Sequence, residues 1–152
     1  MNEANIRVFV DAVSLYFEKL GDRPVVVGAP FLIQNINDYL LDFTGIIGIS
    51  GNHKGSVFFT APETMLNRVL QRLGVLGNDD AKLMDLAGEI SNTISGNARR
   101  EFGSEFMLSV PIVLKGKSEE TRVSRVAEII VIPINWQNMK GNIIVNLTEQ
   151  GA

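Results

Sequence analysis

Hydrophobic residues recur along this chain with two different periods, which predict where its helices and strands lie. Between residues 3 and 20, one face of a helix is marked by Val8, Ala12, Val13, Tyr16 and Leu20. Runs rich in Val, Ile and Phe predict strands at about 24–33, 40–50, 55–60, 105–115, 121–135 and 141–148.

Two further helices are predicted by their end signals. In "TAPETMLNRVLQRLG", Thr60 and Glu63 have the spacing of a capping box, and Pro62 stands in the first turn. A short helix is therefore expected at about 62–73. "GNDD" then caps a longer helix over about 80–102.

The second half of the chain repeats the first. "LGDRPVVVGAP" resembles "FGSEFMLSVP", and "GIIGISGNHKGSVFFT" resembles "EIIVIPINWQNMKGNIIVN". Two pseudo-symmetric halves, at about 1–60 and 79–150, would each supply one helix and three strands, with the helix at 62–73 as a link. The expected fold is α+β: one mainly antiparallel six-stranded sheet with the long helices packed on it.

Length, charge and composition narrow the class of protein. The 152 residues suit a single domain, and a net charge of −3 disfavours nucleic acid or an anionic membrane as the main partner. The absence of cysteine excludes disulfides and thiolate metal sites. The N-terminal residues lack signal-peptide features, and no apolar run reaches the ~20 residues of a membrane span. A cytoplasmic location is expected.

The helix predicted at 80–102 contains the segment "GEISNTISGN", which is rich in poor helix formers. At about 100° per residue, a polar stripe spans a sector of about 80° and the apolar positions lie opposite. The stripe contains Asp85, Glu89, Asn92, Gly96 and Arg99, and the apolar side contains Leu83, Ala87, Ile90 and Ile94. Gly88 and Gly96 flank the stripe and would leave the backbone bare for an approaching surface.

Two simpler explanations remain open, namely a solvated helix face and a close crossing of two elements. The internal repeat favours a site. When Gly103 is aligned with Gly21, Glu89 corresponds to Arg7 and Asn92 to Val10. The first helix therefore lacks the Glu/Asn pair, and the two halves are not expected to be functionally equivalent.

The segment "DLAGEISNTISGN" resembles the active-site helix of the CheC/CheX/FliY chemotaxis phosphatases. Their signature is Asp or Ser, three residues, Glu, two residues, Asn, and a later proline. Asp85, Glu89 and Asn92 match it, and Pro111 stands where the proline is expected, a few residues closer than in the CheC version. Because only the second half carries the pair, the chain most resembles CheX.

The resemblance implies a phosphatase that removes the phosphoryl group from the aspartate of a CheY-like response regulator. Asn92 would position the hydrolytic water and Glu89 would pair with a regulator lysine, while Asp85, Gly88, Gly96 and Arg99 would contact the partner. The protein would need no cofactor of its own, because the regulator carries Mg²⁺. The alternatives are a non-catalytic module that docks on a receiver domain or on a signalling or motor protein and, more distantly, a structural domain.

Several other segments carry weaker signals. "GNHKGS" is expected to be a hairpin turn rather than a phosphate loop, with His53 exposed in it. Trp136 would contact a partner or cap the sheet edge, and 115–122 would be a charged hairpin or loop. Arg99 and Arg100 would form ion pairs or a cationic rim. The apolar strand "RVAEIIVIPINW" would leave an edge that a homodimer could cover, as CheX-like proteins do.

Overall fold

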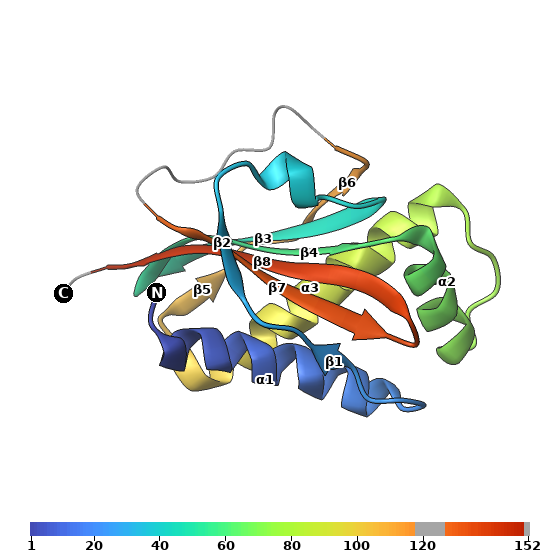
Figure 1. The fold of residues 1–152 in the computed structure, drawn as a ribbon, viewed down its shortest axis with the longest axis horizontal. Helices are drawn as coiled ribbons and strands as arrows, with labels where there is room; N and C mark the ends of the chain where they lie inside the picture. The colour runs from blue at the N-terminus through green and yellow to red at the C-terminus, as the bar shows by residue number, and fades with distance from the viewer. Residues whose placement is uncertain (118–126, 151–152) are drawn as a thin grey trace.

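The computed structural model describes residues 1–117 and 127–150, which form one sheet with helices against it (Figure 1). The helices are α1 (Glu3–Leu20), the 3₁₀ helix η1 (Ile36–Tyr39), α2 (Glu63–Arg72) and α3 (Asp80–Phe102). The strands are β1 (Val26–Val27), β2 (Phe31–Ile33), β3 (Phe43–Gly51), β4 (His53–Ala61), β5 (Phe106–Leu108), β6 (Ile112–Lys115), β7 (Ile129–Trp136) and β8 (Met139–Glu149).

The predicted fold class is confirmed. Every strand pairing is antiparallel, and the order is β1-β7-β8-β4-β3-β5, with β2 also on β7 and β6 also on β3. The sheet has eight strands rather than six because the strands expected at 24–33 and 105–115 are each divided in two. Pro30 and Pro111 stand at the divisions, where proline has no N–H to donate to a neighbouring strand.

The two halves of the chain exchange their first strands. β1 and β2 pair with β7 of the second half, while β5 and β6 pair with β3 of the first half. The centre of the sheet is the pairing of β4 with β8, which joins the last strands of both halves. Neither half therefore forms its sheet from its own strands alone.

The two faces of the sheet are covered differently. α1 and α3 lie on one face, and η1 lies on the other (Figure 1). The larger core lies under the helices and includes Phe9, Phe17, Leu83, Ile90 and Trp136. A smaller cluster on the opposite face contains Ile36, Leu40, Phe58, Val131 and Ile144.

The capping box predicted for α2 is wrong. Thr60 belongs to β4, where its hydroxyl lies 2.8 Å from that of Thr44 and accepts a hydrogen bond from Leu41 N. The first N–H of α2, that of Glu63, donates instead to Asp42 Oδ2 at 2.8 Å. A carboxylate distant in sequence thus caps this helix, which local spacing does not reveal.

The expectations for His53 and Trp136 are also corrected. The hairpin turn is present, but His53 is only 7% exposed, and its ring lies 4.8 Å and 5.5 Å from those of Phe102 and Phe106. Trp136 is fully buried and donates to Arg23 O at 2.9 Å, so it neither faces a partner nor caps an edge. The apolar parts of both rings are therefore buried, at opposite ends of the sheet.

The edges of the sheet differ from those expected. β7 is interior because β1, β2 and β8 pair with it, and the edges are β1–β2 and β5–β6. The strand expected from 121 and the loop expected at 115–122 fall partly on residues 118–126, outside the described residues.

Lys115, at the end of β6, pairs with Asp80 at 2.6 Å, which raises the pKa of Lys115.

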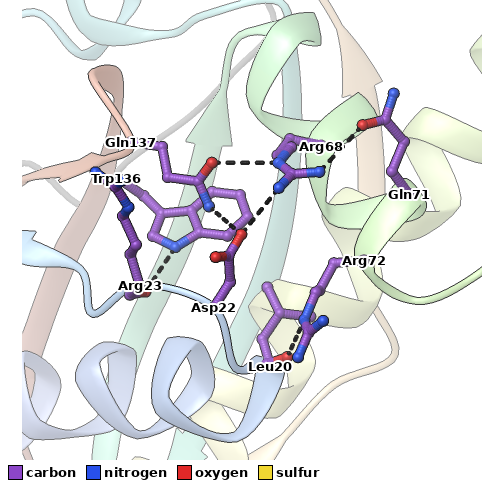
Figure 2. Close-up of polar contacts among 8 residues, drawn as sticks. All are labelled: Leu20, Asp22, Arg23, Arg68, Gln71, Arg72, Trp136 and Gln137. Carbon is purple, nitrogen blue, oxygen red and sulfur yellow. Dashed lines mark hydrogen bonds and ion pairs between the residues drawn. The ribbon is translucent and has the colours of Figure 1, made fainter.

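A polar cluster joins the end of α1 to α2 and to the β7–β8 turn (Figure 2). Asp22 accepts hydrogen bonds from Arg68 at 3.0 Å and from Gln137 at 2.7 Å, and Arg68 also donates to Gln137 at 3.2 Å. Asp22 has a φ of 75°, an uncommon conformation that these contacts hold in place. The cluster fixes the C-terminal end of α1 on the sheet.

Candidate functional site

The amphipathic pattern predicted for α3 is confirmed. Asp79 caps the helix by accepting from Lys82 N at 2.9 Å. The apolar residues Leu83, Ala87, Ile90 and Ile94 are all 0% exposed. The polar residues Asp85, Glu89, Asn92 and Arg99 are exposed, and Gly96 is half-buried.

The expected exposure of Gly88 is wrong. Gly88 is buried, and a Cβ at this position would lie 2.7 Å from Val113 Cγ1 and 3.3 Å from Pro111 Cβ. The chain's own β6 segment therefore occupies the space that the missing side chain leaves. Gly96 differs, since a Cβ there would meet nothing within 4 Å.

Gly45 of β3 allows α3 to pack directly on the sheet, and the sequence analysis did not identify this residue. A Cβ on Gly45 would overlap the carbonyl oxygen of Ala87 and lie 2.8 Å from Gly88 Cα. The helix backbone thus rests directly on the strand. A glycine inside the β-branched run "TGIIG" was the available signal, because such a glycine often marks a close backbone approach.

Pro111 borders one side of the polar stripe of α3. It is distant from α3 in sequence, yet it lies against Gly88, the residue before Glu89. The structure therefore brings the proline of the signature motif to the helix that carries the rest of it.

The helix α1 borders the other side of the polar stripe. Asn97 Nδ2 donates to Ala12 O at 3.2 Å, and the rings of Phe9 and Phe102 lie 5.7 Å apart. Further along α1, Tyr16 is half-buried. Burial, with a smaller contribution from the negative charge of Glu89, raises the pKa of Tyr16 to about 12.

The guanidinium of Arg99 is engaged by the chain itself. Its Nε donates to Phe106 O and its Nη2 to Ser104 O, both at 2.9 Å. The ion pairs formed among residues 1–117 and 127–150 include neither Arg99 nor Arg100, so the expectation of ion pairs there is wrong. Arg99 holds the connection from α3 to β5 and leaves its charge at the surface.

The corresponding face of α1 carries no Glu/Asn pair. Arg7 forms an exposed ion pair with Asp11 at 3.2 Å, and Val10 is half-buried against the core. The difference between the halves is therefore one of packing as well as of residue type.

Neither a metal-binding cluster nor a membrane-spanning helix is found among the described residues. In the described part of the chain, no group of three or more His, Cys, Asp or Glu side chains is placed to hold a metal ion. None of the described helices combines the length and the apolar character needed to cross a membrane.

Comparison with known proteins gives the family. The family model described as "Chemotaxis phosphatase CheX" matches residues 43–135, and the chain therefore belongs to the CheX family. That match spans β3, β4 and all of α3, so it includes the polar stripe. No curated protein matches the sequence.

Solved structures with the same fold cover nearly the whole chain. A CheC-like superfamily protein from Shewanella sp. PV-4 is 27% identical, with a TM-score of 0.84 over 97% of this chain and 99% of that one. The chemotaxis protein CheX from Vibrio vulnificus is 24% identical, with a TM-score of 0.81 over 95% of this chain and 99% of that one. A CheX–CheY–BeF₃–Mg²⁺ complex from Borrelia burgdorferi is 18% identical, with a TM-score of 0.75 over 95% of this chain and 97% of that one.

Proposed function

We propose that this protein dephosphorylates the aspartyl phosphate of a CheY-like response regulator, using Glu89 and Asn92. The observation that carries the proposal is the exposure of both side chains on a helix whose opposite face is fully buried. Such a helix can enter a partner's active site without rearranging its own core. Membership of the CheX family supplies the reaction class.

The chemistry suits an amide and a carboxylate. Hydrolysis of an acyl phosphate requires a water in line with the phosphorus, and positioning provides much of the rate gain. The Asn92 amide can donate and accept hydrogen bonds, so it can orient a water without being a strong base. Glu89 would pair with a lysine of the receiver domain and set the register of docking.

The metal ion in this proposal belongs to the partner. The related complex from Borrelia burgdorferi contains CheX, CheY, BeF₃ and Mg²⁺. We accordingly assign Mg²⁺ to the regulator, where it would neutralise charge on the phosphoryl group, and assign no cofactor to this chain.

The remaining exposed residues of the stripe would contact the partner. Asp85 and Arg99 carry charge at its two ends, and Gly96 leaves open space between them. Gly88 would act indirectly, since it lies beneath Pro111 and keeps α3 close to β6. We further propose that the chain acts as one cytoplasmic CheX-like domain.

The test is Asn92→Ala, assayed with phosphorylated CheY-like receivers from the same host. We expect turnover to be abolished while folding and receiver binding are nearly unchanged, because an exposed amide contributes little to packing. Glu101→Ala, which removes an exposed side chain at the far end of α3, is the control. Retained activity in Asn92→Ala would refute the mechanism, and binding without turnover by the unmodified protein would favour the non-catalytic module.

A further inference from the structure

Val110 is an apolar residue that the fold holds at the surface. It is 83% exposed and lies between β5 and β6. The backbone around it is nevertheless fixed on β3. Ser109 N donates to Gly48 O at 2.9 Å, and Ser109 Oγ accepts from Gly48 N at 2.8 Å and donates to Val110 O at 3.0 Å. The exposure of Val110 therefore belongs to a well-anchored segment, and the proposed reaction does not use it.

The edge of the sheet carries one extra residue at this point. The paired residues on either side are Leu108 with Ile49 and Ile112 with Ile46. Between these pairs the edge has residues 109–111, whereas β3 has only 47–48. Such an insertion is a β-bulge, which interrupts the alternation of side chains between the two faces of a sheet and re-aims a side chain. Regular alternation would place Val110 on the face opposite to that of Pro111, and the bulge removes this constraint.

Val110 and Pro111 both stand opposite Ile47. Ser109 pairs with Gly48 through the hydrogen bonds described above, which leaves one residue of β3 for the two that follow. Ile47 is fully buried in the core beneath the helices. Because residues opposite each other in a sheet share a face, the bulge brings Val110 to the side of the edge on which α3 lies.

The helix α3 runs past this edge in the opposite direction. A Cβ on Gly88 would lie 3.3 Å from Pro111 Cβ. Further along the helix, Arg99 Nε donates to Phe106 O at 2.9 Å. The turns of α3 between Gly88 and Arg99 therefore lie alongside the edge residues between Phe106 and Pro111.

Asn92 is in this part of α3, and Val110 is in this part of the edge. Asn92 is one turn beyond Gly88 and about 40° from it around the helix axis, so it lies on the side of α3 next to the edge. Both Asn92 and Val110 are exposed. An apolar side chain and the proposed catalytic amide thus belong to one surface.

We propose that Val110 is an apolar docking residue: its side chain enters an apolar depression on the receiver domain, beside the phosphorylated aspartate, when Asn92 reaches the phosphoryl group. This inference rests on the proposed function. Removal of an exposed apolar side chain from water favours the complex. The anchored backbone and the stiff, β-branched side chain reduce the conformational entropy that is lost on docking.

The receiver domain is the occupant that the position of Val110 favours. A second copy of this chain on the same surface would cover Asn92 and block the proposed reaction. Glu89 and Asn92 would contact groups that the reaction itself requires, so these contacts alone do not distinguish one receiver from another. An apolar contact beside them provides a further basis for that choice.

The test compares Val110→Thr with Ile112→Thr. Ile112 lies on the same edge and is 60% exposed, but it pairs with Ile46, which packs on the opposite face of the sheet. The probe is a CheY-like receiver loaded with Mg²⁺ and beryllofluoride, so that affinity is read without turnover. We expect Val110→Thr to weaken binding about tenfold, because its hydroxyl would be buried without a partner. Ile112→Thr should change affinity by less than about twofold.

Two further measurements separate docking from a structural effect. Val110→Ile keeps an apolar, β-branched side chain and should bind within about twofold of the unmodified protein. With a phosphorylated receiver, Val110→Thr should raise KM and leave kcat unchanged, because Glu89 and Asn92 remain in place. Thermal unfolding of each variant checks that the fold is retained.

Equal affinity of Val110→Thr and the unmodified protein would overturn the inference, as would an equal loss of affinity in Ile112→Thr or in Val110→Ile. A change of oligomeric state in light scattering, with receiver affinity unchanged, would also overturn it and assign Val110 to a contact between copies.

The outcomes distinguish this inference from the proposed function. Turnover that depends on Asn92, with binding that is indifferent to Val110, would overturn only the inference. Binding that depends on Val110, without turnover by the unmodified protein, would overturn only the catalytic role. Absence of binding by the unmodified protein to every loaded receiver of the host would overturn both.

Discussion

Gly88 of α3 rests on Gly45 of β3 so closely that a Cβ on Gly45 would come within 2.8 Å of Gly88 Cα. Two residues without side chains thus set the height of the site helix above the sheet. Glu89 directly follows the residue that makes this glycine contact, so displacement of the helix at this point would move Glu89.

The first prediction concerns Gly45→Ala. The added methyl group would overlap backbone atoms, which cannot rotate away, so we expect a loss of stability of about 2 kcal/mol or more and a fall in turnover. Gly96→Ala is the matched control, because open space surrounds that position and alanine favours a helix by about 1 kcal/mol. Denaturant unfolding of both variants measures the difference. Equal stability of the two proteins would show that the helix can lift from β3 at little cost.

The second prediction concerns Glu89→Ala. Removing the proposed charge partner of the receiver lysine should weaken binding about tenfold, equivalent to ~1.4 kcal/mol, and lower turnover as well. Isothermal titration with the loaded receiver measures the affinity. The Glu101→Ala protein, which loses a carboxylate outside the stripe, should bind normally. Unchanged affinity of Glu89→Ala would count against its role in docking.

The third prediction concerns transfer of the pair to the first half. Arg7→Glu with Val10→Asn places the same residue types on α1, but Val10 is half-buried against the core. An asparagine there should cost roughly 1–3 kcal/mol, because its amide would be partly unpaired. We expect lower stability and no turnover when this change is made in the Asn92→Ala protein. Restored dephosphorylation would show that the first helix face is accessible after all.

The fourth prediction concerns assembly. We expect a homodimer through the β1–β2 edge, where Val26 and Leu32 are 66% and 61% exposed. That edge lies across the sheet from β5–β6, which flanks the site, so pairing there leaves both α3 faces open. Leu32→Lys should give a monomer by light scattering, whereas Ile112→Lys on the opposite edge should not. A monomeric unmodified protein at working concentrations would contradict this assembly.

The hydrophobic periodicity of the sequence correctly predicted the elements whose formation depends on residues close in sequence. The bounds of α1 and α3 match the prediction because their apolar stripes and end residues are local signals. The polar stripe of α3 was identified for the same reason. His53 was placed wrongly because its burial depends on two phenylalanines about fifty residues away, and no local pattern records them.

The role of Gly88 shows the same limit within the site. Its position beside the stripe suggested access, but its neighbours are Gly45, Pro111 and Val113, all from other elements. One of the simpler explanations left open by the sequence, a close crossing of two elements, therefore holds for Gly88. Gly96 is half-buried, but it meets no other element at its Cβ position and so leaves the open space that was expected.

The exchange of first strands between the two halves bears on how the protein folds and how it can be divided. Val26 pairs with Asn135 and Ile112 with Ile46, so the edges of the sheet form only after distant parts of the chain have met. Such non-local pairing slows folding, and a nascent chain that ends after β4 has no β7 on which to place β1 and β2. A cut within the exposed 73–79 connection would therefore separate the first strands of each half from the strand with which they pair.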